Sequence, residues 1–170
     1  MRNLRVNVFG LAVFAASLAL VGCGQQAIPE PPGLSAEEEL SQFKAAIRAK
    51  YDMKEQAFRD NNPEPILTQF YSDDVISTDN NGVTHMGREG IRPIYEEVIG
   101  STVRVESYKT VVNGDAGWDW VNFHVTLPPG ANADPFTFKM LFLWEKIDGE
   151  WWSHGEMYVL GKFDLEQASH

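Results

Sequence analysis

The chain has 170 residues, of which 44% are hydrophobic and 12% aromatic, and this composition suits one folded domain and excludes a largely disordered chain. The formal net charge of −10 argues against a nucleic-acid partner, because such proteins cluster Lys and Arg against phosphates. A single Cys excludes an intramolecular disulfide and a thiolate metal cluster.

The N-terminus has the pattern of a secretory signal. Arg2 and Arg5 precede an apolar run over 8–21, which is shorter than the roughly 20 residues that a membrane-spanning helix needs. The run ends in Leu20-Val21-Gly22-Cys23, which resembles the bacterial lipobox. This resemblance implies cleavage before Cys23 and attachment of lipid to its thiol. The alternative is an ordinary signal peptide that happens to contain a Cys.

We therefore expect residues 1–22 to be a lipoprotein signal peptide and the mature protein to be anchored to a bacterial membrane, in the periplasm or on the outer cell surface. The bilayer would be a partner through acylated Cys23, since two or more acyl chains give stable anchoring. Residues 23–34 are rich in Pro and Gly and predict an extended tether.

Helical signals dominate the first part of the domain. Ser35 and Glu38 have the spacing of a capping box. Apolar residues then recur on one helical face as far as Phe58, with Glu55 on the same line, and the helix should end near Asn61-Asn62-Pro63. A second short helix is expected over 65–70 and a third over 88–99.

Strand signals dominate the rest. A short strand over 74–78 ends in the turn Asp79-Asn80-Asn81-Gly82, and another short strand leads to Gly87. Four long antiparallel strands are expected over 102–112, 118–127, 136–146 and 151–160. Helices grouped on one side of an antiparallel sheet predict an α+β domain.

Three stretches, in this order, carry a family resemblance: Phe70-Tyr71-Ser72-Asp73-Asp74-Val75, Gly87-Arg88-Glu89-Gly90-Ile91 and Asp148-Gly149-Glu150-Trp151. They resemble the nuclear-transport-factor-2-like fold of ketosteroid isomerases and SnoaL-like cyclases. The resemblance implies a curved antiparallel sheet wrapped around three helices, a cone with a central cavity, over 35–162, followed by a tail over 163–170. This fold hosts several enzyme classes and binding modules, so it does not fix an activity.

The last hairpin assigns the faces of the sheet. A two-residue Asp148-Gly149 turn pairs Trp144 with Ser153 and Phe142 with Gly155, and paired residues share a face. The opposite, outer face would carry His154, Glu156 and Tyr158. Their spacing of two is typical of an acid–base set or of metal ligands, but on the outer face we expect a polar surface or a dimer interface.

Small residues opposite aromatic ones predict a void for a small apolar ligand, and the alternative is that helix side chains fill it. The expected ligand-binding residues are Met140, Phe142, Trp144, Ser153, Met157, Phe123 and Asp119.

Candidate chemistry rests on the same resemblance. Asp79 matches the general-base position of ketosteroid isomerases, and a carboxylate at the mouth of an apolar cavity has a raised pKa. The alternative is that Asp79 only caps its turn. The first-helix Tyr position of those isomerases corresponds to about Glu55, with Tyr51 one turn earlier. Their strand Asp position falls near Phe142 or Leu143, which cannot donate a hydrogen bond. Steroid isomerisation is therefore not expected, whereas acid–base roles for Asp79, Glu55 and Tyr51 stay open.

No nucleotide motif and no spacing of metal-ligating His is present, so no cofactor and no metal are expected. A homodimer is expected through an outer sheet face bearing Trp120, His124, Trp152 and Tyr158. Two functions remain. The favoured one is a lipid-anchored module that binds a small apolar ligand or a partner; the other is a cofactor-free isomerase, dehydratase or cyclase.

Overall fold

A computed structural model describes residues 33–164, in which helices come first and long strands follow. The helix α1 (Ala36–Arg59) begins at Ser35, whose hydroxyl accepts from the Glu38 N–H while the Glu38 carboxylate accepts from the Ser35 N–H. The capping box is thus confirmed. One π-helical turn, η1 (Ile66–Phe70), and the helix α2 (Gly87–Val98) complete the helical part. The signal segment, Cys23 and most of the expected tether lie outside the described residues.

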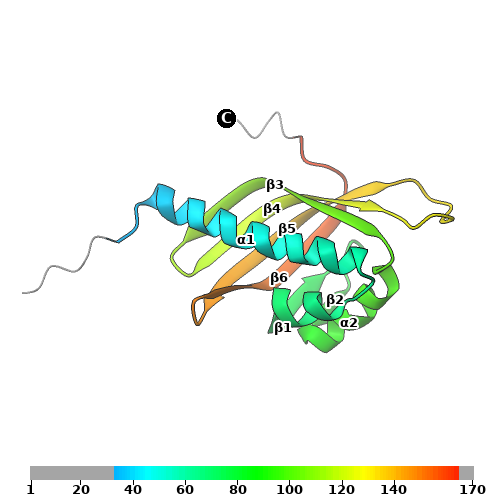
Figure 1. The fold of residues 1–170 in the computed structure, drawn as a ribbon, viewed down its shortest axis with the longest axis horizontal. Helices are drawn as coiled ribbons and strands as arrows, with labels where there is room; N and C mark the ends of the chain where they lie inside the picture. The colour runs from blue at the N-terminus through cyan, green and yellow to red at the C-terminus, as the bar shows by residue number, and fades with distance from the viewer. Residues whose placement is uncertain (1–32, 165–170) are drawn as a thin grey trace, which may run out of the picture. The chain divides into compact units, whose positions relative to one another are not determined.

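Six strands form one sheet in the order β2-β1-β6-β5-β4-β3 (Figure 1). Their bounds are β1 (Tyr71–Thr78), β2 (Thr84–Met86), β3 (Thr102–Asn113), β4 (Ala116–Thr126), β5 (Phe136–Ile147) and β6 (Glu150–Leu160). The four long strands pair antiparallel in chain order, as predicted. β1 joins them parallel to β6, a pairing that the order of elements did not indicate. The expected α+β class and curved sheet are confirmed.

The inner face of the sheet is covered by α1, which crosses the long strands (Figure 1). The Phe43 ring lies 4.5 Å from that of Trp151, and a Cβ at Gly117 would lie 2.6 Å from the Phe43 ring. The helix can therefore approach the sheet only because position 117 has no side chain. α2 packs on β1 and buries Ile91 and Tyr95. Within residues 33–164, no helix combines the length and apolar character needed to cross a membrane.

A β-bulge in β6 changes the faces predicted from the hairpin. Trp144 pairs with Ser153 as expected, but the register then shifts, so that Leu143 pairs with Gly155 and Phe142 with Glu156. His154 is the extra residue, and a one-residue shift reverses which side chains point inward.

Glu156 and Tyr158, expected on the outer face, therefore point into the cone. Met157, expected to bind ligand, is 56% exposed on the outer face. The face predicted for these three residues is wrong, because turn geometry fixes the register only as far as the first bulge.

The outer face of the sheet is partly covered by the chain that follows β6. The Asn122 side chain exchanges two hydrogen bonds with the backbone of Phe163. The Phe163 ring stacks on Tyr108, with the ring centroids 4.6 Å apart. The first residues after the last strand thus pack against β3 and β4.

Candidate functional site

An apolar cavity of about 150 Å³ lies between α2 and the inner faces of the four long strands. An apolar cavity of this volume can hold a molecule of the size of benzene. Glu156 is the charged residue in its wall. The lining is completed by Phe58, Ile94, Tyr95, Val98, Ser101, Val103, Phe123, Val125, Leu127, Phe136, Phe138, Met140 and Tyr158.

Glu156 is the centre of a buried polar network behind this wall. Its Oε1 accepts a hydrogen bond from Ser77 Oγ at 2.8 Å, and its Oε2 accepts one from the Tyr71 hydroxyl. The Lys54 Nζ lies 3.8 Å from Oε2. Each Glu156 oxygen therefore accepts a hydrogen bond, and the Lys54 ammonium lies beside one of them.

Lys54 comes from α1 and is fully buried. Its Nζ donates to the Tyr71 hydroxyl at 2.5 Å and lies 4.2–5.6 Å from the centroids of five aromatic rings. Burial lowers the pKa of Lys54 to about 8, against the attraction of Glu156. The amine therefore still carries its proton at neutral pH. Burying two charges costs free energy, so this pair inside the cone marks a candidate functional site.

Three Tyr side chains complete the polar end of the cavity. Burial raises the pKa of Tyr71 and of Tyr95 well above the ordinary value, so both are neutral phenols. Burial, and then the carboxylates Glu156 and Asp79, raise the pKa of Tyr158 to about 12. The cavity is thus faced by Glu156, Tyr95 and Tyr158, with Lys54 and Tyr71 behind them.

Asp79 has a different position from the one expected of a general base. Its Oδ1 accepts hydrogen bonds from the N–H groups of Asn81 at 2.8 Å and Val83 at 2.9 Å. These bonds, with the Val83 N–H as the largest cause, lower the pKa of Asp79. The expectation of a raised pKa is wrong, and the turn-capping role is the one observed.

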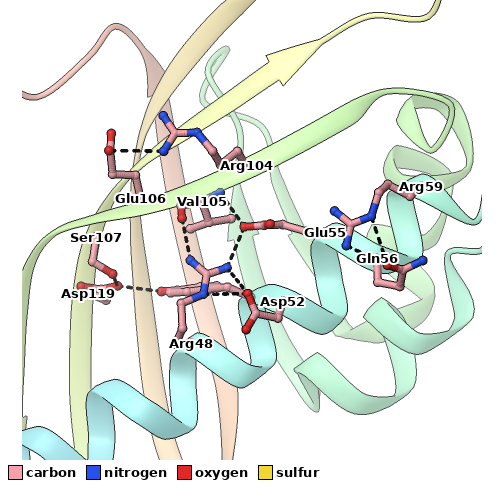
Figure 2. A network of polar contacts seen from close by, with 11 residues as sticks. Arg48, Asp52, Glu55, Gln56, Arg59, Arg104, Val105, Glu106, Ser107 and Asp119 are labelled. Atoms are coloured by element: carbon pink, nitrogen blue, oxygen red, sulfur yellow. Dashed lines mark hydrogen bonds and ion pairs between the residues drawn. The ribbon is translucent and has the colours of Figure 1, made fainter.

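Glu55 belongs to a link between α1 and the free edge of the sheet (Figure 2). Its Oε1 accepts from the Val105 N–H at 2.9 Å and from Arg48 at 2.7 Å, while Arg48 donates to the Val105 carbonyl at 2.7 Å. The pair therefore satisfies both backbone groups of one residue on edge strand β3. Glu55 does not line the cavity.

Tyr51 and Asp119 meet in the core, and neither lines the cavity. The Tyr51 hydroxyl donates to Asp119 Oδ2 at 3.0 Å, and Thr110 donates to Asp119 Oδ1 at 2.8 Å. Asp119 accepts a third hydrogen bond from Ser107 at 2.6 Å (Figure 2). Burial raises the pKa of Asp119 although these hydroxyls oppose the shift. The cluster satisfies a buried carboxylate.

The other expected ligand-binding residues divide into two groups. Phe123 and Met140 line the cavity. Phe142, Trp144 and Ser153 are buried in packed core instead, with the Trp144 ring 5.1 Å from that of Phe70. The void expected there is filled by helix side chains, the alternative that the sequence left open.

Sequence reasoning missed Lys54, Tyr71 and Tyr95, and it set Glu156 aside by placing it on the outer face. A signal existed for Lys54, which lies three residues after Tyr51 on the apolar helical face. Glu156 was hidden by the bulge, because strict alternation placed it outside. Among residues 33–164, no group of three or more His, Cys, Asp or Glu could hold a metal ion.

The chain forms a small α+β domain in which a long helix lies across a curved six-stranded sheet. The domain contains an apolar cavity beside a buried polar network. Residues 51–154 match the SnoaL-like domain family. The match covers more than half of the chain, and the chain therefore belongs to this family.

Solved structures share the fold. A domain of unknown function with a cystatin-like fold from Nostoc punctiforme is 21% identical, with a TM-score of 0.59 over 73% of this chain and 80% of that chain. A Mycobacterium tuberculosis protein of unknown function is 16% identical, with a TM-score of 0.66 over 80% and 82%. A ketosteroid isomerase-like protein from Erwinia carotovora atroseptica is 18% identical, with a TM-score of 0.57 over 74% and 98%. These identities show the fold alone. No curated protein sequence matches the chain.

Proposed function

We propose that the domain binds a small, mostly apolar molecule in the cavity beneath α2. The observation that carries this proposal is the cavity itself, which is apolar on most sides and polar at Glu156, Tyr95 and Tyr158. Ligand sites of this kind combine an apolar wall with a few polar groups that orient the ligand.

The charge of the site restricts the ligand. Lys54 and Glu156 carry opposite charges 3.8 Å apart, so the net charge at the polar end of the cavity is zero. An ion moved into the cavity would lose its hydration without gaining a counter-ion. The ligand is therefore a neutral molecule. The part of it that lies inside the cavity is about the size of one benzene ring.

Two methionines provide a matched test. Met140 lines the cavity, whereas Met157 is exposed on the outer face. With methyl-labelled Met and toluene as the probe, we expect a saturable shift of the Met140 methyl signal and none at Met157. Equal, non-saturating shifts at both would contradict the proposal.

A second candidate function is cofactor-free proton transfer, and Glu156 favours it. This carboxylate reaches an apolar cavity and has an ammonium and two hydroxyls to hold its charge. Loss of a general base typically costs 10² to 10⁴ in rate. Ligands that bind would be incubated in D₂O, and Glu156→Gln should abolish deuterium incorporation while binding persists. No incorporation with the wild type, or equal incorporation with the variant, would exclude this role.

We further propose that the domain is held at a membrane through lipid on Cys23, since Leu20-Val21-Gly22-Cys23 has the lipobox pattern. The chain has one Cys, so Cys23→Ser removes the acceptor completely. Intact mass and membrane fractionation should show an unacylated variant released from the membrane. Acyl groups on that variant would overturn the proposal.

A further inference from the structure

The direction of the hydrogen bonds at the polar end of the cavity can be assigned atom by atom. The Tyr71 hydroxyl has three polar neighbours: Lys54 Nζ, Tyr95 OH and Glu156 Oε2. A neutral phenol has one proton to donate and two lone pairs that can accept. Each neighbour must therefore use one of these three capacities.

Lys54 fixes the first direction. A protonated amine has no lone pair, so Lys54 can only donate to the Tyr71 oxygen. Glu156 fixes the second, because a carboxylate can only accept, and the Tyr71 proton goes to Oε2. The remaining lone pair of Tyr71 faces Tyr95, and the Tyr95 hydroxyl must donate to it.

These directions determine which hydrogen-bonding groups the cavity offers to a ligand. Tyr95 has given its only proton to Tyr71, so it presents only oxygen lone pairs to a ligand. Glu156, with both oxygens already accepting, also presents only lone pairs. Both fixed groups at the polar end are acceptors. The hydroxyls of Tyr158 and Ser101 also line the cavity and are not fixed by this chain of bonds.

We propose that the cavity selects neutral ligands that carry a hydrogen-bond donor, such as a phenolic or alcoholic hydroxyl, over ligands of the same size that can only accept. This inference rests on the proposed function, because it specifies the ligand of the same cavity. An acceptor-only ligand would leave the lone pairs of Tyr95 and Glu156 facing another acceptor, and such mismatched buried groups are costly.

Three probes of one-ring size separate this inference from the proposed function. Phenol can donate, benzonitrile can only accept, and toluene can do neither. Dissociation constants would be measured by titration of the Met140 methyl signal in the wild-type protein. We expect phenol to bind about tenfold or more tighter than benzonitrile, the value of one hydrogen bond to a charged acceptor. Equal affinity for phenol and benzonitrile would overturn the donor rule, while failure of all three to bind would overturn the proposed function.

Two Tyr→Phe variants shift the selectivity in opposite directions. Tyr95→Phe removes a fixed acceptor, so the preference for phenol, measured as the ratio of the dissociation constants of benzonitrile and phenol, should decrease. Tyr158→Phe removes a hydroxyl that could donate to benzonitrile, so the preference should widen. Tyr108→Phe is the matched control, because Tyr108 stacks on Phe163 on the outer face. If both cavity variants shifted the preference in the same direction, or by no more than Tyr108→Phe does, the assignment of donors would be wrong. The affinities of the wild-type protein for phenol and benzonitrile test the preference for donors even if a variant fails to fold.

Discussion

Asp119 is a carboxylate that the fold removes from water and supplies with three hydroxyl donors, from Tyr51, Ser107 and Thr110. Sequence reasoning treated Tyr51 as part of a functional site through the resemblance to ketosteroid isomerases, and Asp119 because it begins an inward-facing run. The structure shows that they satisfy each other within the core, so their contribution is to stability.

Replacement of Asp119 tests this role. Asp119→Ala leaves the buried Tyr51 hydroxyl without its acceptor, removes the acceptor of Ser107 and Thr110 nearer the surface, and should lower the free energy of unfolding by about 1–3 kcal/mol. Asp119→Asn keeps one acceptor oxygen and should cost clearly less. Urea unfolding of both variants measures the difference, and equal losses would show that the hydroxyl bonds do not matter.

Lys54 predicts a specific dependence of stability on pH. Its pKa is about 8 in the folded protein, and that of an unfolded Lys is about 10.4. Between these values the unfolded chain binds more protons than the folded one, so the Lys54 contribution to the free energy of unfolding rises with pH.

The measurement is urea unfolding at several pH values from about 7.5 to 9.5. The stability of the wild type relative to Lys54→Met should increase over this interval. Lys109→Met, at an exposed position of β3, should show the same pH dependence of the free energy of unfolding as the wild type. A pH-independent difference between wild type and Lys54→Met would mean that burial does not lower the pKa of Lys54 in the folded protein.

At the scale of elements, the contact between α1 and β4 depends on Gly117. A Cβ there would lie 2.6 Å from Phe43 and 2.9 Å from the Val111 carbonyl oxygen. Gly117→Ala should therefore push α1 from the sheet and cost about 1–3 kcal/mol.

Gly90→Ala provides the control of opposite sign. Gly90 lies in α2, and its added Cβ would meet only an ordinary contact at 3.8 Å. Ala should stabilise a helix at such a position by roughly 0.5–1 kcal/mol. Thermal unfolding of the two variants should shift in opposite directions, and a shift of the same sign would contradict this view of the interface.

The sequence predicted the elements well because local signals specify them. The capping box at Ser35, the helical spacing of apolar residues and the Asp148-Gly149 turn each lie within a few residues of one another. The bulge at His154 has no such signal, because it depends on pairing of β6 with both β5 and β1. The site was missed for the same reason: Lys54, Tyr71, Tyr95 and Glu156 come from four different elements and meet only in the folded cone.

At the scale of the whole molecule, register places an apolar patch on the outer face of the sheet. Leu143 lies between Gly155 and Trp118, and the next row brings Leu141 between Met157 and Trp120. Trp118, Trp120, Leu143 and Met157 are all exposed in the single chain. We propose that two copies pair through this outer patch, a revision of the expected interface, since Tyr158 faces the cavity instead.

Two Leu→Glu variants test this pairing. Leu143 is 47% exposed in the centre of the outer patch, and Leu160 is 58% exposed at the end of β6. Leu143→Glu would bury an unpaired charge in the interface and should give monomers in sedimentation, whereas Leu160→Glu should behave as the wild type. A wild-type protein that stays monomeric at high concentration would exclude the dimer.

A side chain that fills the cavity beneath α2 tests whether this cavity is the ligand site. Val125 lines the cavity, whereas Val159 is exposed on the outer face. We predict that Val125→Trp fills the cavity and abolishes saturable binding of phenol and toluene, while Val159→Trp binds both as the wild type does. If folded Val125→Trp still bound these probes with unchanged affinity, ligands would bind elsewhere and the account of the site would be wrong.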